Sequence, residues 1–340
     1  MRKKITLFFI LLVFCTDAFA FAEEQKAEEQ KAQEKQAKSK DPLTIFIPVG
    51  YEYMRVEEQS AHRPAGGIGF MIGEQDLPFT EVERRFFGIA LYQPLIFAET
   101  PEPGIPKLFH EIDLLLDARI NRHQLLLIFQ ALSDRPVAGG LDSIQIGAAW
   151  GYEVIRKQHV SLILGAAIAI SDFGITLPSG SAWPALPLPL IRFGVDTKWF
   201  ASSFDFLTGP NFEFTVAPKS RIRFSGDMRM DNYRSIDDII CEFTLWYRFF
   251  DSEHEMGDFA GIGIGIKNEV LDFTLDASGT PAKYYGFMQR AIFAALDLSI
   301  VKIQGGRVFD SCYLLDGEKT KNTGRGFFIS VQGIVPISIK

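Results

Sequence analysis

The residues that could do chemistry in this chain are scattered rather than gathered into a motif. The five histidines form no His-x-x-x-His pair, and none lies near a cysteine; they are His62, His110, His123, His159 and His254. Zinc sites use closely spaced His and Cys ligands, and no Gly-x-Ser-x-Gly segment marks a nucleophilic serine. We therefore expect no metal, no cofactor, no catalytic residue and no enzyme activity.

The glycine-rich segment 261–265 (Gly-Ile-Gly-Ile-Gly) has the look of a phosphate-binding loop. A phosphate cradle needs a helix directly after its glycines. Here the residues that follow continue a strand pattern instead. We interpret the segment as a strand with one thin glycine face.

Charged side chains recur with a period of two between Arg221 and Asp231. One face carries Arg221, Arg223, Ser225, Asp227, Arg229 and Asp231, and the other carries Ile222, Phe224, Gly226, Met228 and Met230. A period of two places successive side chains on opposite faces of a strand. The run is longer than the usual strand of about 5–6 residues, and it is close to the length that a tilted strand needs to cross a bilayer.

These charges determine which face of such a strand could meet lipid. A basic side chain at mid-depth in lipid costs about 2–4 kcal/mol, so we expect the charged face to point into a lumen. The candidate lumen-lining residues are Arg221, Arg223, Asp227, Arg229, Asp231, Arg234, Glu242 and Arg248. Two interpretations stay open: the charges line a water-filled pore and tune its ion preference, or they pair across the lumen and plug it.

The first 20 residues have the pattern of a secretory signal peptide. Arg2, Lys3 and Lys4 precede the apolar run 5–15, and Ala18-Phe19-Ala20 is a small-x-small cleavage site. Hydrophobic residues make up 47% of the chain, yet no later run approaches the roughly 18 apolar residues of a spanning helix. Because only helices and closed barrels satisfy the backbone inside lipid, we expect a β-barrel in the cell outer membrane.

Residues 21–41 differ in composition from the rest of the chain. The pentapeptide 22–26 (Ala-Glu-Glu-Gln-Lys) recurs at 27–31, with almost nothing apolar larger than Ala. Such a segment cannot bury a core, so we predict a charged periplasmic tether. The more specific alternative is an arm that binds a periplasmic or cell-wall partner. A formal net charge of −7 gives no electrostatic case for binding nucleic acid.

Residues 42–340 are expected to form one all-β domain, an antiparallel transmembrane barrel of about 12 strands (10–14). Asn121-Arg122 reads as a hairpin turn, and 178–189, 251–258 and 304–325 read as loops. A helical interpretation of the leucine-rich stretches near 114 and 126 was weighed against strands, which the alternation of charged and apolar residues favours. The expected strands are 44–56, 84–97, 109–120, 124–132, 142–155, 159–170, 190–196, 198–206, 211–217, 221–231, 239–250, 259–267, 270–276, 291–303 and 326–339.

Cysteines are sparse in this sequence. Cys15 leaves with the signal peptide unless it is lipidated: residues 12–15 (Leu-Val-Phe-Cys) resemble a lipoprotein cleavage site, but the bulky Phe14 directly before the cysteine disfavours it. Cys241 and Cys312 remain. Two cysteines do not make a disulfide framework, and whether these two pair stays open.

Several short motifs resemble a family of uncharacterised, porin-like outer-membrane β-barrel proteins of unknown function. They are residues 108–112 (Leu-Phe-His-Glu-Ile), 133–134 (Ser-Asp), 184–191 (Pro-Ala-Leu-Pro-Leu-Pro-Leu-Ile), 209–211 (Gly-Pro-Asn) and 232–234 (Asn-Tyr-Arg). The resemblance spans roughly residues 43–340 and implies an outer-membrane barrel. It implies no substrate and no functional residues. The alternating final strand fits this expectation, but Lys340 stands where such barrels usually end in an aromatic residue.

The sequence thus favours a porin-like passive channel for ions or small polar solutes. The alternatives are a closed structural or adhesin-type barrel that acts through surface loops, a transporter of hydrophobic ligands, and a soluble periplasmic β-protein. As partners we expect outer-membrane lipids and the barrel-assembly machinery, since a membrane barrel has to be inserted.

Overall fold

The chain folds as a succession of β-strands paired edge to edge. A computed structural model describes residues 43–57, 59–73, 84–135, 143–171, 184–206, 210–230, 239–249, 260–275 and 283–339. These ranges belong to one compact unit, Pro42–Lys340. The predicted signal peptide (1–20), tether (21–41) and loop 251–258 lie outside the described residues. Within the described ranges, no helix is long and apolar enough to cross a membrane.

In the described ranges, eighteen strand segments follow one another. They are β1 (Leu43–Val56), β2 (Gln59–Gly73), β3 (Arg84–Tyr92), β4 (Leu95–Phe97), β5 (Leu108–Ile120), β6 (His123–Ser133), β7 (Ile144–Lys157), β8 (Val160–Ile170), β9 (Ala185–Asp196), β10 (Phe200–Phe206), β11 (Pro210–Val216), β12 (Ile222–Arg229), β13 (Ile240–Arg248), β14 (Ala260–Thr274), β15 (Tyr284–Leu298), β16 (Val301–Leu315), β17 (Glu318–Asn322) and β18 (Gly326–Ile339).

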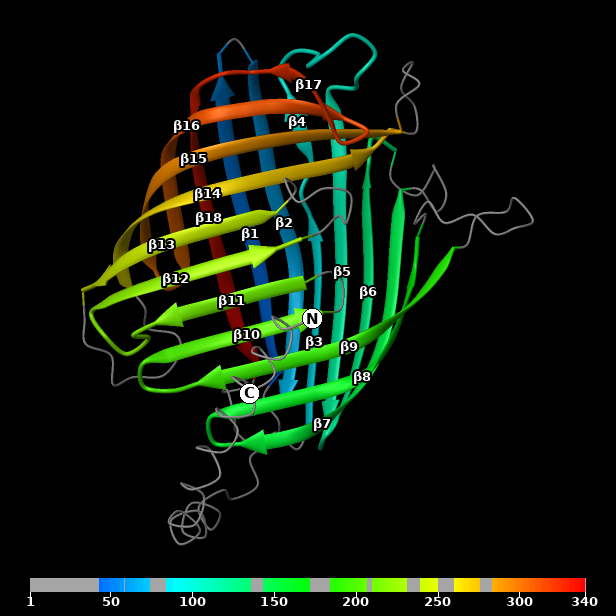
Figure 1. The fold of residues 1–340 in the computed structure, drawn as a ribbon, viewed down its shortest axis with the longest axis vertical. Coiled ribbons are helices and arrows are strands. Elements are labelled where there is room, and N and C mark those ends of the chain that lie inside the picture. Colours follow the sequence, from blue (N-terminus) through cyan, green and yellow to red (C-terminus); the bar gives the residue numbers. More distant parts are fainter. Residues whose placement is uncertain are drawn as a thin grey trace, which may run out of the picture. The chain divides into compact units, whose positions relative to one another are not determined.

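The sheet closes on itself into a barrel (Figure 1). Successive strands pair antiparallel, and β1 pairs with β2 on one side and with β18 on the other. The closing ladder runs the full length of both strands, from Leu43 opposite Ile339 to Val56 opposite Gly326. The predicted all-β antiparallel barrel is therefore confirmed.

The predicted number of about 12 strands is wrong, because the ring has 16 positions. The segments β3 and β4 are two parts of one wall strand, since both lie between β2 and β5. Strand β17 pairs with β16 alone and extends beyond the ring. The expected strands omit β2, β17, the first half of β15 and most of β16, and they divide β14 in two.

Strand β16 occupies a range that was predicted to be a loop, 304–325. Gly305 and Gly306 weaken its strand signal, yet Gly306 is required by close packing. A Cβ there would lie 2.3 Å from the carbonyl oxygen of Ile292 and 2.7 Å from the Cβ of Phe293. Glycine within a strand often marks such a close approach, so tertiary packing, rather than local propensity, explains this residue.

The second wrong loop is the proline-rich end of 178–189, because β9 already begins at Ala185. Pro187 and Pro189 pair in register with Ile168 and Ala166 of β8. On its other side β9 pairs with β10 only over Arg192–Asp196. Its first half is thus a local edge, and proline is tolerated on an edge because no ladder hydrogen bond is lost.

The two rims of the barrel differ in their connections. One rim, here called the turn rim, carries the two-residue turns 121–122, 158–159 and 299–300 and the ends of β1 and β18 at Leu43 and Ile339, but also the longer connections 74–83 and 249–259. Asn121 adopts a positive φ of 54°, which Asn tolerates in tight turns, and the predicted hairpin turn is confirmed. The opposite rim, here called the loop rim, carries the connections 98–107, 134–143, 171–184 and 275–283.

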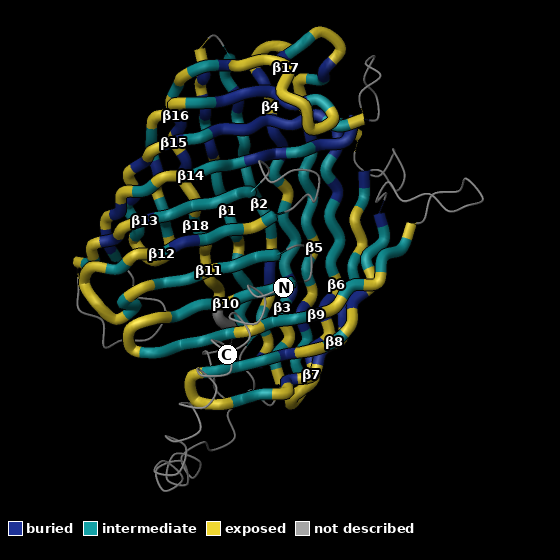
Figure 2. The backbone as a smooth tube through the Cα atoms, in the orientation of Figure 1, coloured by how far each residue is buried: buried dark blue, intermediate teal, exposed yellow. Residues whose placement is uncertain are grey.

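The ring is pinched at the loop rim. Thr274 at the end of β14 pairs with Ser133 at the end of β6, and the N–H of Asp134 donates to the carbonyl of Thr274 at 3.3 Å. Beside this contact lies the largest apolar cluster of the protein, with aromatic rings from β4, β5, β14, β15, β16 and β18. It includes Phe97, Phe109, Phe273, Tyr285, Phe287, Tyr313 and Phe328. Figure 2 shows the buried segments of β14–β16 near this rim.

Closure of the ring predicts a specific crosslink between the first and last strands. Tyr53→Cys with Ile329→Cys, in a chain whose Cys241 and Cys312 are replaced by Ala, should form a disulfide. Tyr53 and Ile329 are direct partners, and directly opposed Cβ atoms lie about 4.5–5.5 Å apart. The crosslinked chain should migrate anomalously on a denaturing gel until it is reduced. Tyr53→Cys with Ile337→Cys should not crosslink, and equal behaviour of both pairs would contradict the register.

Candidate functional site

The register of the ladders separates inward from outward side chains. Asp227 of β12 lies opposite Glu242 of β13, and Arg223 lies opposite Trp246. Glu242 accepts hydrogen bonds from Lys302 and Gln304 of β16 at 3.2 Å each. Because β13 and β16 are separated by two strands, these contacts reach across the curved inner face. The charged register of β12–β13 therefore points inward.

The structure places the predicted lumen residues as follows. Five lie on this inward register, namely Arg223, Asp227, Arg229, Glu242 and Arg248. Arg221 precedes β12 in an exposed position at the turn rim. Asp231 and Arg234 lie outside the described residues. The five described strand residues thus share one register, and their role as a pore lining stays a prediction.

Acidic side chains form a row across the inner wall. Glu213 of β11, Asp227 of β12 and Glu242 of β13 are direct neighbours in the ladders. Directly opposed like charges are unfavourable, and the wall compensates with cations. Lys302 pairs with Glu242 at 3.2 Å. The wall thus carries both signs of charge close together.

The same mixture of signs extends to β9 and β10. Arg192 of β9 pairs with Asp205 of β10 at 2.6 Å, and both side chains are partly exposed. Asp205 is opposite Asn211 of β11, which in turn is opposite Arg229 of β12. The inner wall from β9 to β13 is therefore partly exposed, charged and close to balanced in sign.

The inner wall from β6 to β9 is aliphatic instead. Its buried members come from four adjacent strands: Leu126, Ala149, Ile163, Ala167 and Leu190. Leu190 lies over Gly151, where an added Cβ would approach the Leu190 Cδ2 to 2.8 Å. Large side chains of β8 and β9 thus pack over Gly151 of β7. The inner surface has one apolar wall and one charged wall.

A buried ion network joins strands that lie far apart in the chain. Arg63 of β2 bonds Glu111 of β5 at 2.5 Å and Glu269 of β14 at 3.3 Å. Lys267 of β14 bonds Glu269 at 2.8 Å and Glu52 of β1 at 3.3 Å. The Arg63 and Lys267 side chains are only 13% and 9% exposed. The network ties β14 to β1, β2 and β5 just inside the apolar cluster.

Sequence reasoning missed this network. Its available signal was weak: single charges at Glu52 and Arg63 interrupt apolar or glycine-rich strands, and Lys267 and Glu269 share one strand face. Periodicity shows that these charges point the same way as other inward residues. It does not show that β14 lies against β2, because Arg63 and Glu269 are 206 positions apart.

No metal centre takes shape in the described part of the chain, where no group of three or more His, Cys, Asp or Glu side chains could hold an ion. Cys241 and Cys312 are free thiols. They occupy β13 and β16, two strands that do not pair with each other.

The outer face of the barrel is apolar. Ile264 is 65% exposed and Trp150 is 51% exposed, and most of the other exposed large apolar side chains share their outward register. Members of this band include Ile47, Val49, Ile68, Leu114, Leu116, Leu125, Leu127, Leu164, Ile168, Leu245, Ile262, Ile266, Ile292, Ile329 and Val331. In water such a surface would drive aggregation. Around a closed barrel it is the lipid-facing band of a transmembrane protein.

Amphipathic rings lie toward the ends of this band. The Tyr51 hydroxyl lies 2.5 Å from Nδ1 of His62, and the Tyr92 hydroxyl lies 2.7 Å from Nδ1 of His110. Trp150 stacks on His123 with ring centroids 5.7 Å apart. Rings of this kind favour the boundary between lipid and water. Together with the apolar band, they define the protein as an outer-membrane-type β-barrel.

Comparisons with known proteins show similarity to solved structures only. No protein-family model matches the chain, and no curated protein matches it. OpdQ of Pseudomonas aeruginosa is 11% identical, with 89% of this chain and 100% of that chain covered and a TM-score of 0.35. OccAB4 of Acinetobacter baumannii is 10% identical over 89% and 100%, with a TM-score of 0.36. The outer membrane protein opdK of Pseudomonas aeruginosa is 8% identical over 87% and 99%, with a TM-score of 0.31.

The two faces of β6 should lose different amounts of stability when a charge is added. Leu127 is 43% exposed on the outer face, and Ile128 is its inward neighbour opposite Gly147. Leu127→Arg should lower the free energy of unfolding in lipid by about 2–4 kcal/mol, because Arg would face hydrocarbon. Ile128→Arg should lower the free energy of unfolding by clearly less. Urea titration of both variants in vesicles makes the comparison, and equal losses would argue against the assigned faces.

The ion network predicts a large effect of removing its central cation. Arg63→Met should lower the free energy of unfolding by about 3–5 kcal/mol, since Glu111 and Glu269 would be left buried and unpaired. Adding Glu111→Gln and Glu269→Gln should recover part of this loss, as a multiple-mutant cycle would measure. Arg135→Met, at an exposed arginine, should change stability by less than about 0.5 kcal/mol. A small effect of Arg63→Met would mean that the network is hydrated.

Proposed function

We propose that the protein is a porin-like passive channel of the outer membrane for ions or small polar solutes. The observation that carries this proposal is the closed ring of 16 strand positions with an apolar exterior and charges inside. Eight-stranded barrels are filled by their own side chains, whereas barrels of about 16–18 strands leave an aqueous channel.

We infer that the solute path follows the inner face of β6–β13. On the other side, the apolar cluster and the ion network occupy the interior between β14 and the strands β1, β2 and β5. The proposed lining is Arg223, Asp227, Arg229, Glu242 and Arg248, with Arg221, Asp231 and Arg234 as its proposed continuation. Because both signs alternate along this wall, the channel should discriminate weakly between cations and anions.

The connections support an orientation for the channel. Barrels of this class have short periplasmic turns and longer external loops. The turn rim, which carries most of the short turns, then faces the periplasm, and the pinched loop rim, which carries most of the long connections, faces outward. Outer-membrane lipids and the barrel-assembly machinery are the partners that this proposal requires.

A second candidate is the closed barrel that acts through its loops as a structural or adhesin-type protein. The observation in its favour is the pinch between Thr274 and Ser133 beside the apolar cluster. These contacts close part of the external mouth. Conductance separates this candidate from the channel.

Planar-bilayer recording of the refolded chain (residues 21–340) should show discrete current steps. In Arg223→Glu with Arg229→Glu, the permeability ratio should shift toward cations by at least about fivefold per reversed residue. Each reversal changes two unit charges, and one unit charge 4–8 Å from an ion in water is worth about 0.5–1 kcal/mol. Reversal potentials in a salt gradient measure the ratio.

The control is Arg84→Glu, at an exposed arginine in the outward register of β3, which should leave the ratio unchanged. Folded, inserted protein that gives a silent bilayer would overturn the channel and favour the closed barrel.

A further inference from the structure

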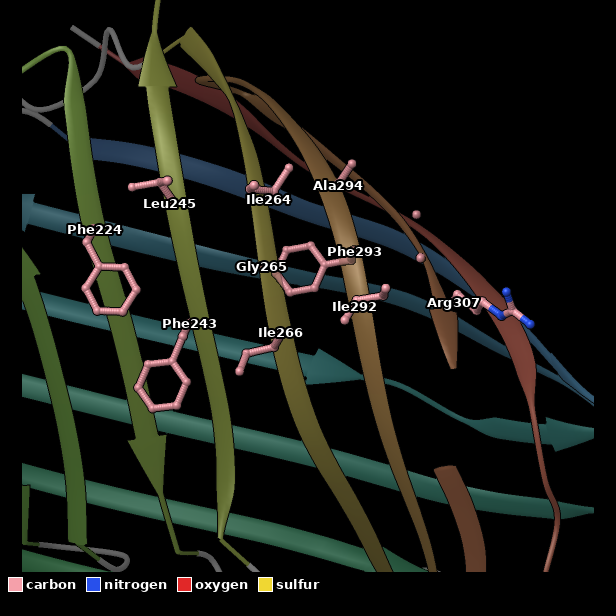
Figure 3. Close-up of a pocket in the computed structure, with 12 residues that line it drawn as sticks. Phe224, Phe243, Leu245, Ile264, Gly265, Ile266, Ile292, Phe293, Ala294 and Arg307 are labelled. Carbon is pink, nitrogen blue, oxygen red and sulfur yellow. The ribbon is translucent and has the colours of Figure 1, made fainter. Parts of the chain in front are cut away.

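The outer face of β12–β16 contains a groove rather than a smooth apolar surface. Its volume is about 910 Å³. Phe224 and Phe243 line one side, Ile266 and Ile292 lie toward the other, and Arg307 stands at its end (Figure 3). Apart from Arg307, the lining residues are apolar: Phe224, Phe243, Leu245, Ile264, Gly265, Ile266, Ile292, Phe293, Ala294, Gly305 and Gly306.

The groove follows from small residues in an otherwise bulky outward register. Ala294 of β15 lies directly opposite Gly305 of β16, so that two strands contribute almost no side-chain volume there. On the far side, the Phe224 and Phe243 rings stack with centroids 6.3 Å apart. This aromatic wall faces the low strip left by Ala294 and Gly305.

Arg307 is a cation in the lipid-facing register. It lies opposite Ile292 on one side and Phe327 on the other, and its own side chain is exposed. No ion pair or hydrogen bond connects its guanidinium to another described residue. Arginine facing hydrocarbon is costly unless it reaches the interface or an anion. This position therefore calls for an anionic partner from the membrane.

The position of Arg307 fits the headgroup level of a bilayer. The next row toward the loop rim is polar, with Asn268 of β14, Arg290 of β15 and Asp310 of β16 side by side. Arg290 pairs with Asp310 at 3.3 Å, which leaves Arg307 uncompensated. Arg55 of β1 lies in the same row as Arg307, with Phe327 between them. The apolar groove thus ends at a net positive boundary.

We propose that this groove binds one phosphate-bearing membrane lipid, with an acyl chain along the apolar floor and the phosphate on Arg307. The chain buries apolar surface that would otherwise contact disordered lipid, and the guanidinium gains charge-assisted hydrogen bonds to phosphate oxygens. The headgroup lies toward the loop rim, the direction in which Arg307 can extend along the interface. This site requires the membrane barrel but does not depend on conduction.

Lipid retention in detergent tests the proposal. Barrel purified with dioleoyl phosphatidylglycerol and passed through size exclusion should retain about one lipid per chain, as mass spectrometry of the intact complex would show. Arg307→Gln should lower retention about tenfold, the size expected for a lost charge-assisted hydrogen bond. Arg307→Lys should keep part of it. Ala294→Phe, which fills the groove but leaves Arg307 in place, should also lose the lipid.

The controls separate this site from ordinary lipid contact. Arg84→Gln, outward on β3, should retain the lipid like the unaltered protein. Dioleoylglycerol, which lacks phosphate, should be retained about tenfold less, and millimolar inorganic phosphate should not displace the bound lipid. Equal retention by Arg307→Gln and the unaltered protein, or equal retention of both lipids, would overturn the proposal. If Ala294→Phe fails to fold, as judged by its circular dichroism, the Arg307 variants decide.

Discussion

The structure depends on one constraint, the pairing of every backbone N–H and C=O group without help from water. Inside a bilayer an unpaired strand edge is too costly to persist. The ladder between β1 and β18, the first and last strands, removes the final edge by pairing Leu43 through Val56 with the end of the chain. Strand tilt, curvature and the number of strands must all be compatible with that closure. Gly306 is one residue that this closure requires, because only a residue without a side chain lets β15 and β16 approach there.

Once the ring is closed, the period of two divides the side chains into two environments. Most outward residues meet lipid and are therefore Ile, Leu, Val and aromatic rings. Inward residues may be charged, but their charges are not evenly distributed. The interior near β14, β1, β2 and β5 is filled by aromatic packing and a buried ion network, while β9–β13 carry partly exposed pairs such as Arg192 and Asp205. One side of the barrel is therefore built for rigidity and the other side for contact with water.

The buried ion network fixes how β14 lies against β1, β2 and β5 more than it adds net stability. Removing ions from water largely cancels the attraction between them. However, Arg63 finds Glu111 and Glu269 together only when β14 lies against β2 and β5 in one register. The neighbouring aromatic rings, such as Phe109 stacked on Tyr285 at 5.2 Å, supply the apolar burial. On the outer surface, Arg307 has no such partner among the described residues, and the proposed lipid phosphate would supply one.

Local pattern by itself determined the class of fold and the faces of the clearest strands. The strict alternation in β12 predicted that Arg223, Asp227 and Arg229 point inward, because the other register lies in lipid, where a charge is costly. Local pattern failed where contacts with a distant part of the chain determine a residue. The prolines of β9 are tolerated because β10 leaves that half of β9 unpaired. Gly306 of β16 is required by close packing against β15. For the same reason only the tertiary structure decided the strand count, the pinch and the ion network. Periodicity tells which way a side chain points, but ring closure decides what lies across the lumen from it, as the 206 positions between Arg63 and Glu269 show.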